Sequence, residues 1–164
     1  MKTALCPGTY DPVTYGHLDI IARCAANFEH VYVAVVKTAL RKQTLFTLEE
    51  RIYFLEESTR HLPNVSVIPL EGLVVEVALR VGADALVKGL RAIMDFEYEF
   101  QMAQLNKTLY PDLETVYLMA SPSVGFVSSS GVKEIAAFGG ALTGLVPPLV
   151  AERFKEIYSS AAEG

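Results

Sequence analysis

The chain has 164 residues, of which 51% are apolar, and a formal net charge of −5. This length fits a single domain spanning residues 1–164, and the apolar content suffices for a buried core without disulfides or a structural metal. The acidic balance excludes bulk nucleic-acid binding, which needs a basic face, but it permits an anionic substrate held by a few placed cations.

Short β-branched runs alternate with longer segments of helical period, a pattern typical of parallel strands joined by crossover helices. In chain order the pattern predicts a strand at 2–6, a helix at 16–28, a strand at 31–36, a helix from 47 to about 61, a strand at 65–70, a helix at 73–81, a strand at 85–88, a helix at 95–109, a strand at 115–119, a helix at 128–138 and a last helix from 147–148. The predicted fold class is α/β: a Rossmann-like, doubly wound, five-stranded parallel sheet with helices on both faces.

The cysteines and the apolar runs indicate a cytoplasmic protein. Cys6 and Cys24 form no CxxC pair and no metal-ligand spacing, so we interpret them as buried thiols in a reducing compartment. Residues 1–7 are too short for the apolar region of a signal peptide, and no apolar run reaches the length of a membrane span. We therefore expect a soluble protein that binds neither membrane nor nucleic acid.

Sheets of this type bind ligands beyond the carboxyl ends of their strands, where the strand order reverses. The loops that follow the first, fourth and fifth strands, at 7–17, 88–99 and 120–130, therefore form the candidate site. Within the first loop, Gly8 is expected to free the backbone and let a ligand come close, and Gly16 leaves the helix start open. His17 adds a hydrogen-bond donor beside a helix N-terminus, which attracts phosphate.

Cations and hydroxyls follow in the other loops. Lys88 and Arg91 flank the end of the fourth strand and suit two separate phosphates. Residues 128–130 are three serines at a helix start; one suffices for a cap, and three favour an anion site. In the helix at 95–109, Phe96, Phe100 and Met102 are interpreted as packing residues. Glu99 either faces the nucleotide or is a solvated carboxylate.

At this point the residues resemble a known family. The Thr14-x-Gly16-His17 signature and the later serine run resemble the nucleotidyltransferase superfamily, which includes the catalytic domains of class I aminoacyl-tRNA synthetases. Within it, nearly the whole chain is similar to the bacterial phosphopantetheine adenylyltransferases. Five segments in order support the similarity: PGTYDP at 7–12, FTLEER at 46–51, KGLR at 88–91, DFEYE at 95–99 and FVSSS at 126–130.

The resemblance implies transfer of the adenylyl group of ATP to 4'-phosphopantetheine, giving dephospho-coenzyme A and pyrophosphate. It implies Mg²⁺ carried by the nucleotide phosphates, with no metal site made by protein side chains, and a homohexamer built from two trimers. The catalytic residues that it implies are His17, Lys42 and Arg91. The ATP contacts that it implies are Thr9, Tyr10, His17, Gly89, Leu90, Arg91, Glu99, Val124, Gly125, Phe126, Val127, Ser128, Ser129 and Ser130. The phosphopantetheine contacts that it implies are Thr9, Lys42, Val74 and Lys88.

The sequence departs from the family pattern in four places. Tyr10 stands where phenylalanine is usual, and Lys88 stands where many members have arginine. The segment before Lys42 is one residue longer than usual and lacks an Asn-Pro turn, which leaves Arg41 as the alternative acceptor-phosphate ligand. Residues 124–125, Val-Gly, replace an aromatic–serine pair.

The implied reaction needs no general base, because a phosphate nucleophile with a second pKa of about 6 is largely ionised at neutral pH. This agrees with the lack of a Ser–His–Asp set in the sequence. One alternative is another adenylyltransferase, such as one that acts on nicotinamide mononucleotide; such an enzyme would not be expected to share both 88–91 and 95–99. A second alternative is a nucleotide-binding regulator without catalysis, and the presence of His17, Lys42 and Arg91 argues against it.

Overall fold

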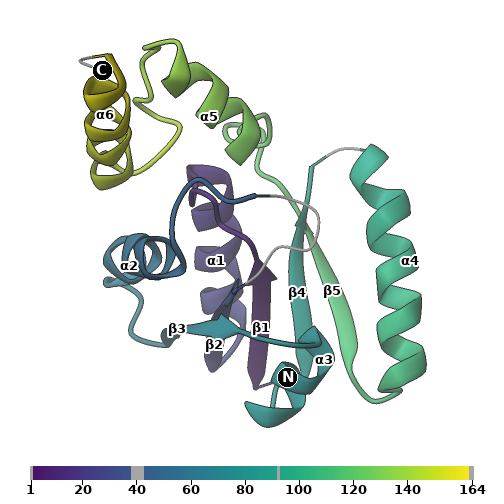
Figure 1. Cartoon of the computed structure of the whole chain (residues 1–164). Helices are drawn as coiled ribbons and strands as arrows, with labels where there is room; N and C mark the ends of the chain where they lie inside the picture. Colours follow the sequence, from purple (N-terminus) through teal and green to yellow (C-terminus); the bar gives the residue numbers. More distant parts are fainter. Residues whose placement is uncertain (1, 38–42, 92, 163–164) are drawn as a thin grey trace.

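The computed structural model describes residues 2–37, 43–91 and 93–162, and these form a five-stranded sheet with six helices (Figure 1). In chain order the elements are β1 (Thr3–Gly8), α1 (Tyr15–Asn27), β2 (His30–Val36), α2 (Leu48–Thr59), β3 (Val65–Leu70), α3 (Val74–Arg80), β4 (Ala85–Leu90), α4 (Ile93–Leu109), β5 (Glu114–Met119), α5 (Ser129–Ala137) and α6 (Pro148–Ala162). Each predicted element is present, with its boundaries within two residues of the prediction.

The strand order is β3-β2-β1-β4-β5, and neighbouring strands are parallel, as predicted. The chain winds outward from β1 to β3, then returns to β1's other side with β4. β1 pairs with β2 along its whole length, from Thr3 to Gly8, but it pairs with β4 only through Ala4–Ala85 and Leu5–Leu86. Beyond those pairs β1 and β4 separate, which opens a crevice at the carboxyl edge where the order reverses.

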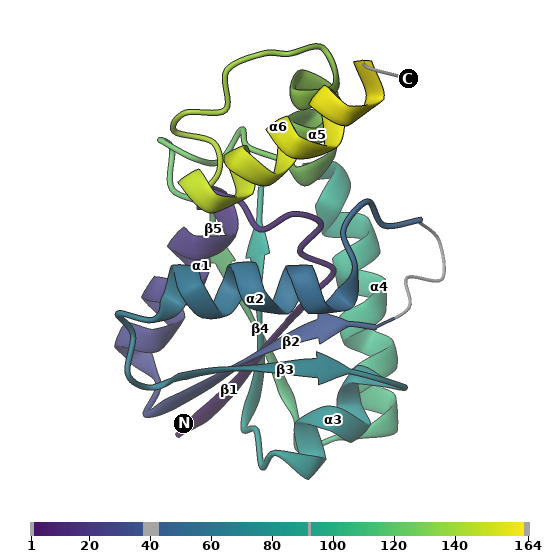
Figure 2. The ribbon, with the colours of Figure 1, turned by 60° about the vertical axis from the view of Figure 1, so that its left-hand side comes forward.

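Helices cover both faces of the sheet, which confirms the predicted layers. α1 and α2 lie on one face, and α3 and α4 lie on the other (Figure 2). The alternation of side chains along each strand separates two buried clusters: Cys6, Val31 and Val33 belong to the cluster under α1, α2, α5 and α6, whereas Leu5 and Ala34 belong to the cluster under α3. Among the residues that the structure describes, no helix is long and apolar enough to cross a membrane.

The packing role predicted for the aromatic residues of α4 is wrong. Phe96 and Phe100 are 51% and 55% exposed, and their rings stack on each other with centroids 5.9 Å apart. The two residues are four apart and lie on one face of the helix, but the sheet lies under a different face. Met102 is partly buried. α4 therefore presents an apolar surface to the outside of the chain.

The side chains that cap the start of α2 allow a direct test of how much a helix cap stabilises this fold. The Thr47 hydroxyl accepts the Glu50 N–H at 3.1 Å, and the Glu50 carboxylate accepts the Thr47 N–H at 3.0 Å, which forms a capping box at the expected helix start. We expect Thr47→Ala to lower the free energy of unfolding by about 1 kcal/mol, because a helical N–H loses its acceptor. Chemical denaturation measures this, with Thr47→Ser as the control; equal stability of the alanine and serine variants would contradict it.

Candidate active site

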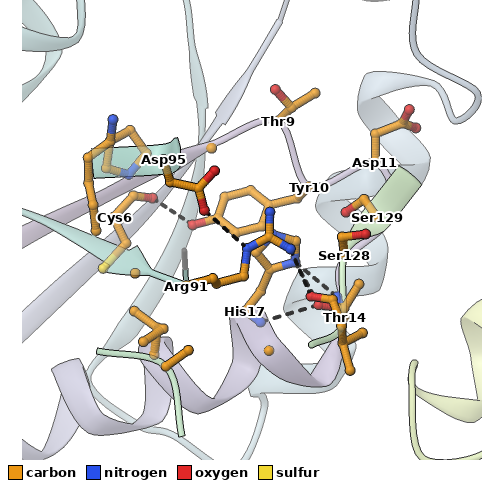
Figure 3. A pocket seen from close by; sticks show the side chains of 18 of the residues that line it. Cys6, Thr9, Tyr10, Asp11, Thr14, His17, Arg91, Asp95, Ser128 and Ser129 are labelled. Carbon is orange, nitrogen blue, oxygen red and sulfur yellow. Dashed lines mark hydrogen bonds and ion pairs between the residues drawn. The ribbon is translucent and has the colours of Figure 1, made fainter. Parts of the chain in front are cut away.

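The crevice between β1 and β4 forms a cavity of about 560 Å³. It is lined by the ends of both strands, the loop between β1 and α1, the start of α1, and the first turn of α5 (Figure 3). The structure places these predicted site residues in its wall: Thr9, Tyr10, His17, Lys88, Gly89, Arg91, Glu99, Val127, Ser128, Ser129 and Ser130. The three loops expected from the sequence thus meet at one site.

Other predicted site residues lie elsewhere. Leu90 ends β4 outside the cavity wall, and Phe126 is 73% exposed. Val124 packs against the core under α1, and Gly125 donates its N–H to Ser121 O at 2.8 Å within a turn. Val74 begins α3 and packs against the second buried cluster. The predicted phosphate ligand Lys42 and its alternative Arg41 lie outside the described residues, so their roles remain predictions.

A capping box fixes His17 at the start of α1. Thr14 is the N-cap, and its backbone N–H donates to Nδ1 of His17 at 3.0 Å, while the His17 N–H donates to Thr14 Oγ1 at 3.4 Å. Histidine here takes the place of the usual Glu or Gln at the third helical position. Because a backbone N–H can only donate, Nδ1 is an acceptor, and the neutral ring has its proton on Nε2. The ring therefore presents a donor to the cavity.

The electrostatic surroundings keep this imidazole neutral. Burial, assisted by the positive charge of Arg91, lowers the pKa of His17 from 6.5 to about 4. Tyr10 lies edge-on to the ring with centroids 5.0 Å apart, and its own hydroxyl donates to Cys6 O at 3.0 Å. The extra hydroxyl at this departure from the family pattern is thus satisfied inside the protein.

The cations that line the described part of the cavity each lie beside a carboxylate. Lys88 contacts Glu99 at 2.6 Å, and Tyr117 donates to the same carboxylate at 3.4 Å. Arg91 lies 3.7 Å from Asp95 and donates through Nη1 to Val127 O at 3.1 Å. An anionic ligand must therefore compete with protein carboxylates for these cations.

The serine run has two structural roles beside the cavity. Ser128 is the N-cap of α5, and its Oγ accepts the Gly131 N–H at 3.1 Å. Ser129 Oγ donates to Pro12 O at 2.8 Å, which ties the helix start to the first loop. The first turn of α5 then faces the cavity, where the positive end of a helix dipole attracts anions.

The glycines serve packing rather than backbone conformation. A Cβ at Gly8 would lie 2.9 Å from the Tyr10 ring, and one at Gly89 would lie 2.9 Å from Cγ1 of Ile20. Gly8 is extended within β1 and is not among the glycines with positive φ, so the backbone reason predicted for it is wrong. A Cβ at Gly16 would lie 3.3 Å from Val124 O, which shows that this glycine lets the loop after β5 lie against α1.

Sequence reasoning missed several residues of this site. Asp11 is 4% exposed and accepts a 2.8 Å ion pair from Lys133, and both line the cavity. The spacing of Ser129 and Lys133, four residues apart, places them on one helical face and could have indicated the lysine. Thr14 could have been found as an N-cap three residues before His17. Asp11 has no such local signal, because its partners Leu45, Phe46 and Lys133 are distant in sequence.

No group of three His, Cys, Asp or Glu side chains in the described ranges could hold a metal ion by itself. Cys6 and Cys24 are free, buried thiols with their sulfurs 3.6 Å apart. The cavity wall offers a neutral donor, paired cations and helix N-termini.

Comparisons with known proteins agree with this geometry. Residues 5–135 match the cytidylyltransferase-like family. The fold matches a Vibrio parahaemolyticus protein assigned as a nicotinate-nucleotide adenylyltransferase, with a TM-score of 0.69 over 94% of this chain and 92% of that chain. The sequence identity is 15%, so this likeness concerns the fold alone. The family match, which spans most of the chain, shows the class: the chain belongs to the cytidylyltransferase-like nucleotidyltransferases.

Relatives with much higher identity narrow the class. The phosphopantetheine adenylyltransferase of Caldanaerobacter subterraneus is 52% identical over 98% of this chain and 100% of the relative. Those of Rubrobacter xylanophilus and Symbiobacterium thermophilum are 53% and 50% identical, each over 97% of this chain, and cover 96% and 98% of the relatives. The chain belongs to the phosphopantetheine adenylyltransferase family.

The neutral state of His17 can be measured by NMR titration. We expect its imidazole to titrate near pH 4, well below 6.5, and Arg91→Ala to raise that pKa because a repelling charge is removed. Since the folded protein then binds fewer protons than the unfolded chain between these values, this residue's contribution to stability falls as the pH is lowered from 6.5 to about 4. The resonance that is lost in His17→Asn identifies the signal of His17. A His17 imidazole that titrates near pH 6.5 would contradict the assignment of a neutral donor.

Proposed function

We propose that this protein transfers the adenylyl group of ATP to 4'-phosphopantetheine, giving dephospho-coenzyme A and pyrophosphate. The single observation that best supports the mechanism is the neutral His17, whose Nε2–H faces a cavity lined by cations and the start of α5. The identity of the acceptor is supported by the names of relatives that are about half identical over nearly the full chain.

The proposed step is a direct in-line displacement. An oxygen of the acceptor phosphate attacks the α-phosphorus of ATP, the bond from that phosphorus to the bridging oxygen breaks, and pyrophosphate leaves with the electron pair. The acceptor phosphate is already ionised at neutral pH, so no protein base removes a proton. Catalysis then consists of positioning the phosphates and stabilising the charge that develops on the α-phosphoryl oxygens.

We assign His17 Nε2–H and Arg91 to that developing charge, and Lys88 to the acceptor phosphate. Thr9, which follows the end of β1 in the cavity wall, is proposed to contact both substrates. Lys42 remains a proposed ligand of the acceptor phosphate, on the basis of the sequence. We propose that Mg²⁺ enters with the nucleotide phosphates; the oxygens of Asp95 and Glu99 in the cavity wall are donors of the kind that it prefers. Location in the cytoplasm remains part of the proposal.

A pyrophosphate-release assay with two acceptors tests the function. We expect turnover with phosphopantetheine and none with nicotinamide mononucleotide, because the segments 88–91 and 95–99 supply the cavity wall in this family's pattern. Turnover with the mononucleotide alone would favour the alternative adenylyltransferase. Nucleotide binding without turnover of either acceptor would favour the regulator.

His17→Ala should lower kcat by about 100-fold with the fold intact, which is the scale expected when one preorganised donor to developing charge is removed. KM should change little if the donor acts mainly in the transition state. His61→Ala serves as the matched control, because His61 lies beyond the end of α2 and outside the cavity wall. A kcat close to that of the unaltered enzyme in His17→Ala would refute the role.

We also propose that the chain assembles as a hexamer of two trimers. The observation behind this is the apolar surface of α4, where Phe96, Phe100, Leu105 and Leu109 are each more than half exposed. Sedimentation should give a mass about six times the chain mass of 17.9 kDa. Phe100→Glu should shift the protein to smaller species, whereas Lys155→Gln, with the same charge change at an exposed position of α6, should not. A monomeric unaltered protein at micromolar concentration would overturn the proposal.

A further inference from the structure

Arg51, in the first turns of α2, is the largest fully buried side chain of the described residues, with 1% of its surface exposed. Its guanidinium donates to backbone carbonyl oxygens. Nη1 donates to Thr9 O and to Val36 O, both at 2.8 Å. Nε lies 3.2 Å from Phe46 O and 3.3 Å from Thr47 O. No ion pair with a carboxylate is formed by this side chain within the described ranges. Backbone carbonyls therefore make the direct contacts to this charge, and the negative charges of Asp11 and Glu49 act on it without an ion pair.

These carbonyls belong to three separate segments: the loop after β1, the last residue of β2, and the start of α2. The same contact region is joined from the other side by Asp11, whose carboxylate accepts the N–H groups of Leu45 and Phe46 at 2.9–3.1 Å. A guanidinium from α2 and a carboxylate from the first loop thus hold residues 9–11 against residues 45–47. Arg51 itself does not line the cavity, whereas Thr9 and Tyr10 do.

The peptide bond between Thr9 and Tyr10 is the part of the loop that Arg51 controls. Tyr10 has a φ of 50°, a left-handed conformation that a bulky side chain adopts only when its surroundings enforce it. In a trans peptide the C=O and the following N–H point in opposite directions. Because the Thr9 carbonyl points to Arg51 behind the loop, the Tyr10 N–H points to the cavity side. That N–H has no acceptor among the described residues.

We propose that Arg51 is a positioning residue for adenylyl transfer: by fixing the Thr9 carbonyl, it aims the Tyr10 N–H at a phosphoryl oxygen of the bound nucleotide. This inference rests on the proposed function for its chemistry. A buried arginine is needed here because its planar fork places Nη1 and Nε donors on carbonyls of different segments simultaneously. A lysine keeps the charge but concentrates its donors at one point, so it cannot reproduce this arrangement.

The first arm of the test uses the unaltered protein labelled with ¹⁵N-tyrosine, in which eight tyrosine amides are observable. Tyr10→Phe assigns the Tyr10 signal by its loss. Addition of ATP should shift the Tyr10 amide resonance as the N–H gains a phosphate acceptor. A Tyr10 amide that does not respond while ATP binds would overturn the proposal. This arm requires neither turnover nor a variant of Arg51.

The second arm compares Arg51→Lys with Arg153→Lys. Arg153 contacts Glu50 at 2.7 Å at the start of the same helix, but none of its observed contacts is to the first loop. We expect Arg51→Lys to lower kcat by about 100-fold with little change in KM, as for a displaced reacting group, and to reduce the ATP-induced shift of Tyr10. Arg153→Lys should retain both properties. Val150→Ala, a buried change in α6, shows what loss of stability alone does to kcat.

The outcomes separate a positioning role of Arg51 from a purely structural one, and both from the proposed function. If Arg51→Lys is folded and has the kcat of the unaltered enzyme, or if Val150→Ala loses as much kcat at equal stability, Arg51 is only structural and the inference is wrong. If the unaltered protein makes no dephospho-coenzyme A, but ATP shifts its Tyr10 amide and Arg51→Lys reduces that shift, the proposed function fails while the positioning role stands.

Discussion

The hydrogen bond from the Thr14 N–H to Nδ1 of His17 determines both where α1 begins and what the cavity can do. As a cap it satisfies a backbone donor at the helix start. As a constraint on the ring it leaves the proton on Nε2, and burial beside Arg91 keeps the ring uncharged. A charged imidazolium would bind the phosphates of substrate and product alike. In the proposed reaction a neutral donor would interact most strongly where negative charge develops, so its stabilisation would be concentrated in the transition state.

The sheet supplies the place where that donor can act. β1 lies in the middle of the strand order, and its pairing with β4 ends at Leu5–Leu86. The helices that follow β1 and β4 leave to opposite faces, so no crossover covers the crevice between the strand ends (Figure 1). Gly89 lets Ile20 of α1 pack against β4 at the floor of this crevice, and Gly16 lets the loop after β5 close one side of it. Three loops distant in sequence therefore meet at one cavity.

The sequence predicted the order and type of each element because hydrophobic period and caps are local signals. It also predicted the loops that meet, because parallel strands share one carboxyl edge. It could not predict the contact of Lys88 with Glu99, or the burial of Asp11 and Arg51, because those depend on which groups from other parts of the chain lie opposite in the fold. Amphipathic spacing likewise cannot tell whether the apolar face of α4 meets the sheet or the outside, and the packing role given to Phe96 and Phe100 was wrong for that reason. The family resemblance, in contrast, rests on short motifs and was confirmed by full-length relatives.

The pairing of cations and carboxylates in the cavity bears on turnover. Lys88, Arg91 and Lys133 lie beside Glu99, Asp95 and Asp11 respectively, so these six charges sum to zero. A cavity of unpaired cations would attract polyanions more strongly, but it would also retain pyrophosphate, and product release would then limit the rate. Carboxylates that keep each cation in place lower the free-energy cost of organising the site. They also compete with pyrophosphate for the cations once that product has formed. Since binding energy spent equally on substrate and transition state does not speed the chemical step, a balanced cavity with a neutral donor in its wall suits an enzyme whose substrates and products are all anions.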